Sequence, residues 1–215
     1  MPRIKTDTPC GRINGWDIKQ TDNHPVALKA KTEIRERVLR AIGAESASVF
    51  DAFAGEGVMY QRVWHRAAEC VGCDATRFCR DERLAFVGDN RRVMRSLDLG
   101  QFNIFDFDAY GSPWDQVYLM IKRRKVAAGE RIGLVLTEGQ GMKMDMGGMS
   151  QSLSLIAGVR QYMPGMGAAQ QQIIDRAVAR TADAMGCTIN RQWQAISKHS
   201  STIRYIGVAM QGNAA

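Results

Sequence analysis

Long apolar runs are missing from this 215-residue sequence, and histidine is scarce. No run approaches the roughly 20 apolar residues that a membrane-spanning helix requires, and the polar first residues lack the core of a signal peptide. We therefore expect a cytoplasmic protein without a membrane partner. The three histidines, His24, His65 and His199, show no pattern typical of a catalytic triad.

Cysteine is also sparse, and its count of five is odd. An odd number in a chain of this size argues against a disulfide framework and favours free thiols in a reducing compartment. Cys70 and Cys73 have the spacing of a zinc-ligand pair, with Cys79 nearby. No second pair or histidine cluster completes four ligands, and the first two fall in an expected buried strand, so we expect no metal site.

Positive charge is in excess, because 29 Lys and Arg face 22 Asp and Glu, which gives a formal net charge of +7. A basic surplus attracts polyanions and makes nucleic acid a candidate partner. The shares of apolar residues (45%) and charged residues (24%) are typical of a soluble globular protein and argue against disorder. We expect an irregular N-terminal arm over residues 1–24 and a single domain over residues 25–215, with no separate recognition domain.

Short apolar runs alternate with amphipathic stretches of helical length, which predicts strands alternating with helices. The expected strands are residues 48–53, 70–74, 84–87, 102–108, 131–137, 188–196 and 202–210. The expected helices between them are residues 58–66, 91–97, 114–125 and 168–185. This order predicts an α/β fold with a seven-stranded, mainly parallel, doubly wound sheet. The last two strands are so close in sequence that only a hairpin can join them, so the last strand is antiparallel.

Two further segments flank or interrupt this alternation. Residues 25–42 carry apolar residues at helical spacing among many Lys and Arg, which predicts an amphipathic helix covering one sheet edge. Residues 138–167 are rich in Gly and Met and lack clear periodicity. A stretch of this kind forms either a mobile lid or an irregular packed excursion, and the sequence leaves both open.

The first expected strand leads directly into the sequence Asp51-Ala52-Phe53-Ala54-Gly55-Glu56-Gly57 and then a helix. Glycines at a strand-to-helix turn let a ligand approach the backbone, and a helix N-terminus attracts a negative ligand group. A dinucleotide-binding fingerprint would need a third glycine where Tyr60 stands, so dehydrogenase chemistry is disfavoured.

This turn resembles motif I of the S-adenosylmethionine-dependent methyltransferases with a Rossmann-like fold (class I), whose usual form is acidic-x-Phe-x-Gly-x-Gly. The resemblance implies S-adenosyl-L-methionine as cofactor. It implies an acid on the ribose hydroxyls after the second strand and an acid on the adenine amine after the third, and the final hairpin agrees with it. The cofactor-binding residues that it implies are Asp51, Phe53, Ala54, Gly55, Gly57, Asp74, Asp89 and Asn90.

Each of these acids also has a simpler explanation. Asp51 is able to cap its turn, and Asp74 and Asp89 are able to act as helix N-caps. The three acids, however, stand at the carboxyl ends of successive strands, where open parallel sheets bind their ligands. The coincidence favours a cofactor site.

After the fourth strand comes the sequence Asp108-Ala109-Tyr110-Gly111-Ser112-Pro113-Trp114. It is similar to the Asp-Pro-Phe-Gly-Ser-Pro motif of the tRNA N2,N2-dimethylguanosine methyltransferases, with Ala109 in place of the first proline. The resemblance covers residues 46–138. It implies substrate contacts from Ser112, Pro113 and Trp114.

The chemistry of an exocyclic amine explains why such a motif is needed. The amine is a poor nucleophile, because its lone pair is delocalised into the base, so the site has to orient the nitrogen. We expect the Asp108 carboxylate and the Ala109 carbonyl each to accept one N–H, while Tyr110 or Trp114 stacks on the base. The simpler alternative is that Asp108 caps the following helix and that the rest is turn chemistry.

Basic residues near this edge are candidates for phosphate contact. Arg91 begins a helix there with Arg92 and Arg95, and His199 lies in the final hairpin with Lys198 and Arg204. Arg3, Lys5, Arg12 and Lys19 are further candidates on the arm. The basic run at residues 122–125 ends a helix, so we expect it on the side away from the cofactor.

We therefore expect a methyltransferase that acts on an exocyclic amine of a nucleic-acid base, with N2 of guanine in RNA preferred. The alternatives are N6 of adenine in DNA or RNA, a small-molecule or protein amine, and a cofactor-binding or inactive subunit that needs a protein partner. The same amine geometry serves both bases, so Asp108 does not separate them.

Overall fold

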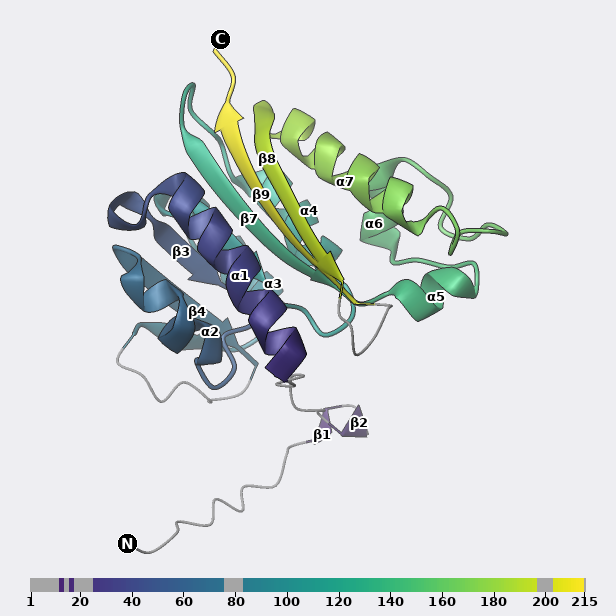
Figure 1. The fold of residues 1–215 in the computed structure, drawn as a ribbon, viewed down its shortest axis with the longest axis horizontal. Coiled ribbons are helices and arrows are strands. Elements are labelled where there is room, and N and C mark those ends of the chain that lie inside the picture. Colours follow the sequence, from purple (N-terminus) through teal and green to yellow (C-terminus); the bar gives the residue numbers. More distant parts are fainter. Residues whose placement is uncertain (1–11, 14–15, 18–24, 76–82, 197–202, 215) are drawn as a thin grey trace, which may run out of the picture.

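The computed structural model describes residues 12–13, 16–17, 25–75, 83–196 and 203–214. Its centre is a seven-stranded sheet with the strand order β5-β4-β3-β6-β7-β9-β8 (Figure 1). The strands are β3 (Ser48–Asp51), β4 (Glu69–Asp74), β5 (Ala85–Val87), β6 (Ile104–Phe107), β7 (Arg131–Glu138), β8 (Cys187–Ile196) and β9 (Arg204–Gly212).

The directions of the strands confirm the predicted topology. The strands β5, β4, β3, β6 and β7 pair in parallel, whereas β9 runs antiparallel to both of its neighbours, β7 and β8. The chain between β8 and β9 is too short for a crossover helix, which explains why the last strand is reversed.

Seven α-helices lie in the described part of the chain, none of them long and apolar enough to cross a membrane. They are α1 (Pro25–Ile42), α2 (Val58–Arg62), α3 (Asn90–Ser96), α4 (Trp114–Arg123), α5 (Gly141–Asp145), α6 (Gln151–Ala157) and α7 (Gln170–Ala184). The helix expected over residues 58–66 breaks at Val63, and a 3₁₀ turn, Trp64–Arg66, follows. Within the predicted irregular arm, β1 (Arg12–Ile13) and β2 (Trp16–Asp17) pair antiparallel.

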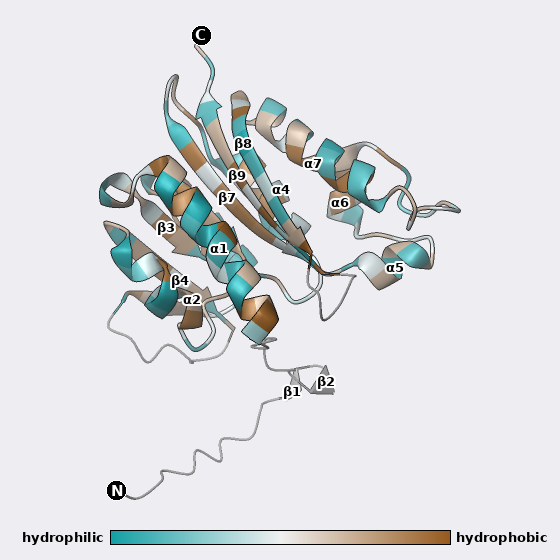
Figure 2. Cartoon of the chain, in the orientation of Figure 1, coloured by the Kyte–Doolittle hydropathy of each residue, from teal (hydrophilic) through white to brown (hydrophobic). Residues whose placement is uncertain are grey.

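The helices cover both faces of the sheet, because successive strand residues point to opposite sides. Val49 and Ile104 pack with α1 on one face, whereas the adjacent Phe50 and Phe105 pack with α4 and α7 on the other. Figure 2 shows that α1 and α7 each carry both hydrophilic and hydrophobic residues, as expected for helices with one buried face. The doubly wound prediction is confirmed.

The helix α1 has the predicted bounds but not the predicted place. It lies over the face formed by β7 and β9 and not along a sheet edge (Figure 1). Glycines beneath it permit the close approach. A Cβ atom at Gly133 would lie 2.6 Å from a methyl of Val38, and one at Gly207 would lie 2.9 Å from a methyl of Ile34.

Residues 138–167 form packed structure with two short helices, α5 and α6. Met144, Met149 and Met166 are fully buried in the main core, and Gly148 forms a β-bridge with Tyr162. The packed alternative therefore describes this segment better than a lid does.

The glycine beneath α1 gives a stability prediction. Replacing Gly133 by Ala places a methyl against Val38, so we expect the free energy of unfolding to fall by about 1–3 kcal/mol, the usual cost of overpacking a core. Urea denaturation followed by circular dichroism measures the change. Arg191→Ala, on the exposed side of β8, serves as control and changes stability by less than about 0.5 kcal/mol. Equal stability of the two variants would contradict the close approach of α1.

Candidate functional site

The predicted site residues gather at the carboxyl edge of the parallel strands. Asp51 ends β3, Asp74 ends β4, and Asp108 follows β6. The strand order reverses between β3 and β6, since β4 and β5 extend to one side and β7 to the other. A crevice outside such a switch point is where open α/β sheets bind ligands.

The turn after β3 is fixed to the neighbouring strand by backbone contacts. Gly55 and Gly57 have φ angles of 48° and 82°, in the left-handed region that favours glycine. The Gly55 N–H donates to the Asp74 carboxylate at 2.9 Å, and the Ala54 N–H donates to the Cys73 carbonyl at 2.9 Å. The helix that follows, α2, has only five residues, so the attraction of its N-terminus for a negative group is weaker than that of a longer helix.

An open pocket of about 540 Å³ lies outside the ends of β3, β4 and β5. Five of the predicted residues line it, namely Phe53, Asp74, Asp89, Asn90 and Arg91. Small-molecule and cofactor sites usually measure about 300–1,000 Å³, so the volume suits a ligand of nucleoside size. Further lining comes from Ala52, Ala75, Gly88 and Gln116.

Asp89 and Arg91, on the wall of this pocket, are partners of each other. Asp89 caps α3 by accepting the Arg91 N–H at 2.9 Å, and it also binds the Arg91 guanidinium at 2.9 and 3.1 Å. The hydrogen bonds from Arg91 lower the pKa of the Asp89 carboxyl. The helix-cap alternative therefore holds for Asp89. Arg91, expected to contact phosphate, is paired with Asp89 and lies 3.7 Å from Asp115.

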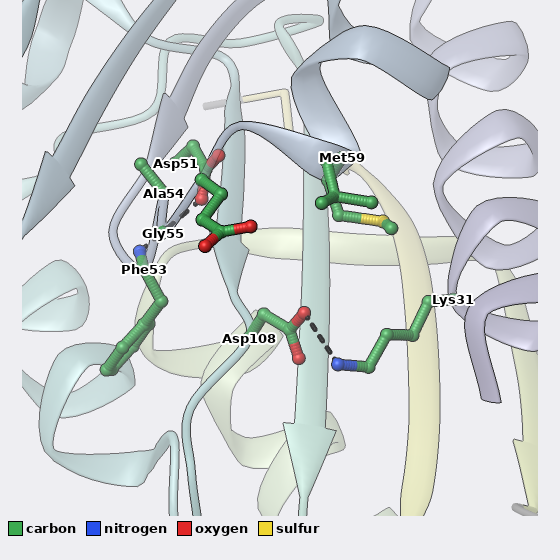
Figure 3. Close-up of a pocket in the computed structure, with 9 residues that line it drawn as sticks. Lys31, Asp51, Phe53, Ala54, Gly55, Met59 and Asp108 are labelled. Atoms are coloured by element: carbon green, nitrogen blue, oxygen red, sulfur yellow. Dashed lines mark hydrogen bonds and ion pairs between the residues drawn. The ribbon is translucent and has the colours of Figure 1, made fainter. Parts of the chain in front are cut away.

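A second, smaller cavity of about 30 Å³ lies between this turn and α1 (Figure 3). Asp51 and Gly55 line it on one side, Met59 on another, and Lys31 and Asp108 on the third. A space of this size holds about one water molecule. Figure 3 shows Lys31 extending from α1 to meet Asp108 at the end of β6.

Asp108 is surrounded by donors. One carboxylate oxygen lies 3.1 Å from the Lys31 ammonium and 3.2 Å from the Arg35 guanidinium, and the other accepts the Thr137 hydroxyl at 2.6 Å. Burial alone would raise the pKa of Asp108, but the two positive charges and this hydrogen bond outweigh it and lower the pKa. Asp108 is therefore a carboxylate, and a carboxylate has about four lone-pair positions. Among the described contacts, one position remains for a ligand, on the Thr137 side.

Arg35 connects α1 to the centre of the sheet. Its guanidinium forms two hydrogen bonds to Asp106, at 2.6 and 2.8 Å, and the Trp64 indole donates to the same carboxylate at 2.8 Å. Both Arg35 and Asp106 are fully buried. Burial opposes the charge of Arg35, but Asp106 and Asp108 outweigh it, so its pKa rises.

Lys31 and Arg35 were not predicted to belong to the site. Cations on an amphipathic helix usually extend to solvent, so their residue types alone do not indicate a buried site. A signal was present, however, because both occur four residues apart in the buried stripe of α1 that also contains Ile34, Val38 and Ile42.

Asp51 has a comparable buried setting. It accepts the Arg83 guanidinium at 3.0 Å and the Phe53 N–H at 3.4 Å. Burial raises the pKa of Asp51 to about 7, with a further contribution from the charge of Asp106, while Arg83 acts in the opposite direction. Asp51 thus stabilises its own turn, as the simpler alternative proposed.

The loop after β6 departs from expectation at its end. Ala109 is buried, whereas Tyr110 is 75% exposed and is free to stack on a base. Trp114 is fully buried and donates its indole N–H to Glu138, so the expected stacking by Trp114 is wrong. Trp114 lies on the hydrophobic face of α4, and its side chain packs in the core.

Ser112 and Pro113 both have structural roles at the start of α4. The Ser112 hydroxyl accepts the Gln140 amide at 2.7 Å and donates to the Ser150 hydroxyl at 3.2 Å, and Pro113 is the buried N-cap residue of α4. The buried Pro113 does not face a substrate, whereas the predicted contact of the half-buried Ser112 stays a prediction. His199 and Lys198 lie outside the described residues.

Among the other basic residues, Arg204 and Arg124 have structural partners, whereas Arg3, Lys5 and Lys19 lie outside the described residues. Arg204 donates to Gln170 at 2.9 Å. In the basic run at 122–125, Arg124 is buried and donates to the Phe102 carbonyl at 3.0 Å, at the end of α4 far from the site. Cys70 and Cys73 are buried thiols, and no group of three metal-ligating side chains occurs among the described residues.

Solved structures share the fold of this chain, but the sequence comparisons found no match. No protein-family model and no curated protein sequence matches the chain. Trm1 from Pyrococcus horikoshii, solved in complex with S-adenosyl-L-methionine, has a TM-score of 0.60 and 16% identity. The match covers 98% of this chain and 58% of the Trm1 chain, so this chain spans less than two thirds of that protein.

Two further structures support the same fold. TYW2 from M. jannaschii in complex with AdoMet has a TM-score of 0.53 and 11% identity, over 86% of this chain and 77% of its own. N-methyltransferase NodS from Bradyrhizobium japonicum WM9, with S-adenosyl-l-homocysteine, has a TM-score of 0.51 and 9% identity, over 90% of each chain.

This chain therefore has the class I fold of the S-adenosylmethionine-dependent methyltransferases, as its sequence predicted. The protein with a TM-score of 0.60, Trm1, belongs to the tRNA N2,N2-dimethylguanosine methyltransferases, whose motif the segment after β6 resembles. Identities of 9–16% concern architecture, and a fold by itself does not define a substrate.

The buried ion pair of α1 gives a second prediction. Arg35→Met leaves Asp106 and Asp108 without their shared cation, so we expect the free energy of unfolding to fall by about 3–5 kcal/mol. Arg66→Met is the matched control, because Arg66 pairs with Glu36 at 3.1 Å on the surface, and its loss costs less than about 1 kcal/mol. Urea denaturation compares the two, and equal losses would refute the central role of Arg35.

Glu138 gives a prediction on pH. It is fully buried, and burial raises its pKa from 4.5 to about 7 despite hydrogen bonds from Gln140 and Trp114. The folded state thus binds this proton more tightly than the unfolded state. The resulting stability is fully present below the unfolded pKa of 4.5 and is lost as the pH rises through about 7.

We therefore expect the stability of the wild type, relative to Glu138→Gln, to fall by up to about 3 kcal/mol between pH 4.5 and 7. Urea titrations across this range measure the difference. Asp51 titrates in the same range in both proteins, so the difference isolates Glu138. The exposed Glu45→Gln variant should follow the wild type, and parallel curves for wild type and Glu138→Gln would contradict the assignment.

Proposed function

We propose that this chain is an S-adenosylmethionine-dependent methyltransferase that methylates an exocyclic amine of a base in RNA, with N2 of guanine as the acceptor. The observation that carries the proposal is the ionised Asp108, placed beside the switch point of a methyltransferase fold. Lys31, Arg35 and Thr137 occupy three of the four lone-pair positions of the Asp108 carboxylate. The fourth is left for the acceptor amine.

The pocket outside β3, β4 and β5 suits the cofactor. Its volume of about 540 Å³ accommodates a nucleoside, and Asp74 provides a carboxylate at the end of β4 where the ribose hydroxyls would lie. Phe53, from the turn after β3, lies on the pocket wall, whereas Gly55 of the same turn lines the smaller cavity beside Asp108. When bound, the cofactor supplies a methyl group on a positively charged sulfur.

Asp108 acts on the acceptor amine. As a carboxylate it accepts one N–H, and the Ala109 carbonyl accepts the other, so the nitrogen lone pair points at the incoming methyl carbon. Because Lys31 and Arg35 keep Asp108 ionised, the acceptor role persists at neutral pH. Tyr110, exposed at the same loop, stacks on the base.

Several observations favour RNA. The formal charge of +7 attracts a polyanion, and the Asp108 loop is similar to the motif of enzymes that modify guanine N2 in tRNA. The Trm1 similarity supports the same substrate class. We further propose that a protein partner contributes to RNA recognition.

The decisive experiment supplies labelled S-adenosyl-L-methionine with separate pools of tRNA, rRNA, DNA and protein. We expect label in tRNA, and we expect Asp108→Asn to lower the transfer rate by about 10²-fold or more, since loss of one preorganised hydrogen-bonding group typically has this cost. Asp183→Asn, exposed at the end of α7, is the control and transfers normally.

Other outcomes distinguish the alternatives. Nuclease digestion and mass spectrometry of the product identify the nucleotide, and methylated adenine would replace guanine as the acceptor. Cofactor binding by calorimetry without transfer to any pool would indicate a subunit that requires a partner. Full transfer by Asp108→Asn would remove Asp108 from the mechanism.

A further inference from the structure

A short chain of amide groups crosses the wall of the larger pocket. The Asn90 side chain donates its NH₂ to the carbonyl of Ala52 at 2.8 Å. The oxygen of the same side chain accepts the NH₂ of Gln116 at 2.9 Å. Ala52, Asn90 and Gln116 come from the ends of β3 and from the starts of α3 and α4, and all three line the pocket.

The Ala52 carbonyl sets the polarity of this chain. A backbone carbonyl only accepts hydrogen bonds, so the nitrogen of Asn90 has to face it. The oxygen of Asn90 then faces Gln116, which in turn has to present its nitrogen. The remaining Gln116 atom, Oε1, is therefore an acceptor, and reversing the amide would place like groups against each other along the chain.

This last acceptor lacks a protein partner. Gln116 is 6% exposed, and its Oε1 has no hydrogen bond among the residues that the structure describes. A buried acceptor without a donor is unfavourable, so a ligand that donates a hydrogen bond here gains affinity. Because the atom has almost no exposed surface, binding of a donor from the pocket has to include a small shift of the Gln116 side chain.

We propose that Gln116 recognises the adenine base of the bound cofactor by accepting one N–H of its exocyclic amine at Oε1. This inference rests on the proposed function, since it needs the cofactor in the larger pocket. Adenine is the part of the cofactor whose amine donates from the ring edge, and the pocket wall at Gln116 provides the matching acceptor.

The acid that the sequence resemblance assigned to this task has other partners. Asp89 accepts three hydrogen bonds from Arg91, and because its side chain is 36% exposed, water satisfies the one lone-pair position that remains. Asp74 has one oxygen bound to the Gly55 N–H, and its proposed partner in the cofactor is the ribose. Gln116, on a helix from the other half of the sheet, is the acceptor without such a partner.

The fixed polarity implies base selectivity. Hypoxanthine carries a carbonyl oxygen in place of the adenine amine, so it presents an acceptor to the Gln116 acceptor. The pair cannot be rescued by rotating the amide, because the Asn90 and Ala52 contacts would be lost. A site built for a donor rejects a ligand that lacks it.

Calorimetry on the full chain tests the proposal with two probes, S-adenosyl-L-homocysteine and its deaminated analogue S-inosyl-L-homocysteine. We expect the wild type to bind the inosyl compound at least about 10-fold more weakly. Gln116→Met has a similar length without the acceptor, so we expect it to bind both probes within about threefold of each other. Gln192→Met, exposed on β8, makes the same exchange away from the pocket and keeps the wild-type preference.

Each outcome decides the proposal. Equal binding of the two probes by the wild type overturns it, whether or not Gln116→Met folds. A preference retained in Gln116→Met but lost in Asp89→Asn assigns the amine to Asp89 and also overturns it. If Gln116→Met lowers the affinity for both probes by the same factor, Gln116 contacts a part that the probes share, such as the ribose. This result also overturns the proposal. Wild-type protein that binds neither probe refutes the proposed function itself.

Discussion

The hydrogen bonds between Arg35 and Asp106 determine how the rest of the molecule is arranged. Neither charge is tolerated in the core alone, so the helix before the sheet and the central strand have to meet with both partners present. The same guanidinium extends to Asp108, one residue beyond the strand. Arg35 on α1 therefore fixes the position of this helix and, together with Lys31, keeps Asp108 ionised.

The arrangement of the sheet was largely predictable, because alternation of apolar runs and turns defines strand order within one fold class. All seven expected strands exist, and the hairpin reverses the last one. The place of α1 was not predictable in this way. Helical periodicity identifies a buried stripe but not the surface that it covers, which here depends on Gly133 and Gly207 beneath it.

The sequence predicted which strand ends form the site but not the hydrogen-bond and ion-pair partners of its side chains. Motif order indicated which strand ends meet, and Asp51, Asp74 and Asp108 do meet at one edge. Whether a carboxylate is already engaged depends on side chains far away in sequence, as the partners of Asp108 on α1 show. Trp114 illustrates the same limit, since the motif marks its position but not which side of α4 it faces.

The distance in sequence between Arg35 and Asp106, 71 residues, has a consequence for biosynthesis. The N-terminal part of a chain leaves the ribosome first, so α1 emerges long before either of its carboxylate partners or the strands β7 and β9 on which it lies. Docking it earlier would bury an unpaired guanidinium. We therefore infer that α1 packs onto the sheet only after nearly the entire domain has been translated, as one of the last steps of folding.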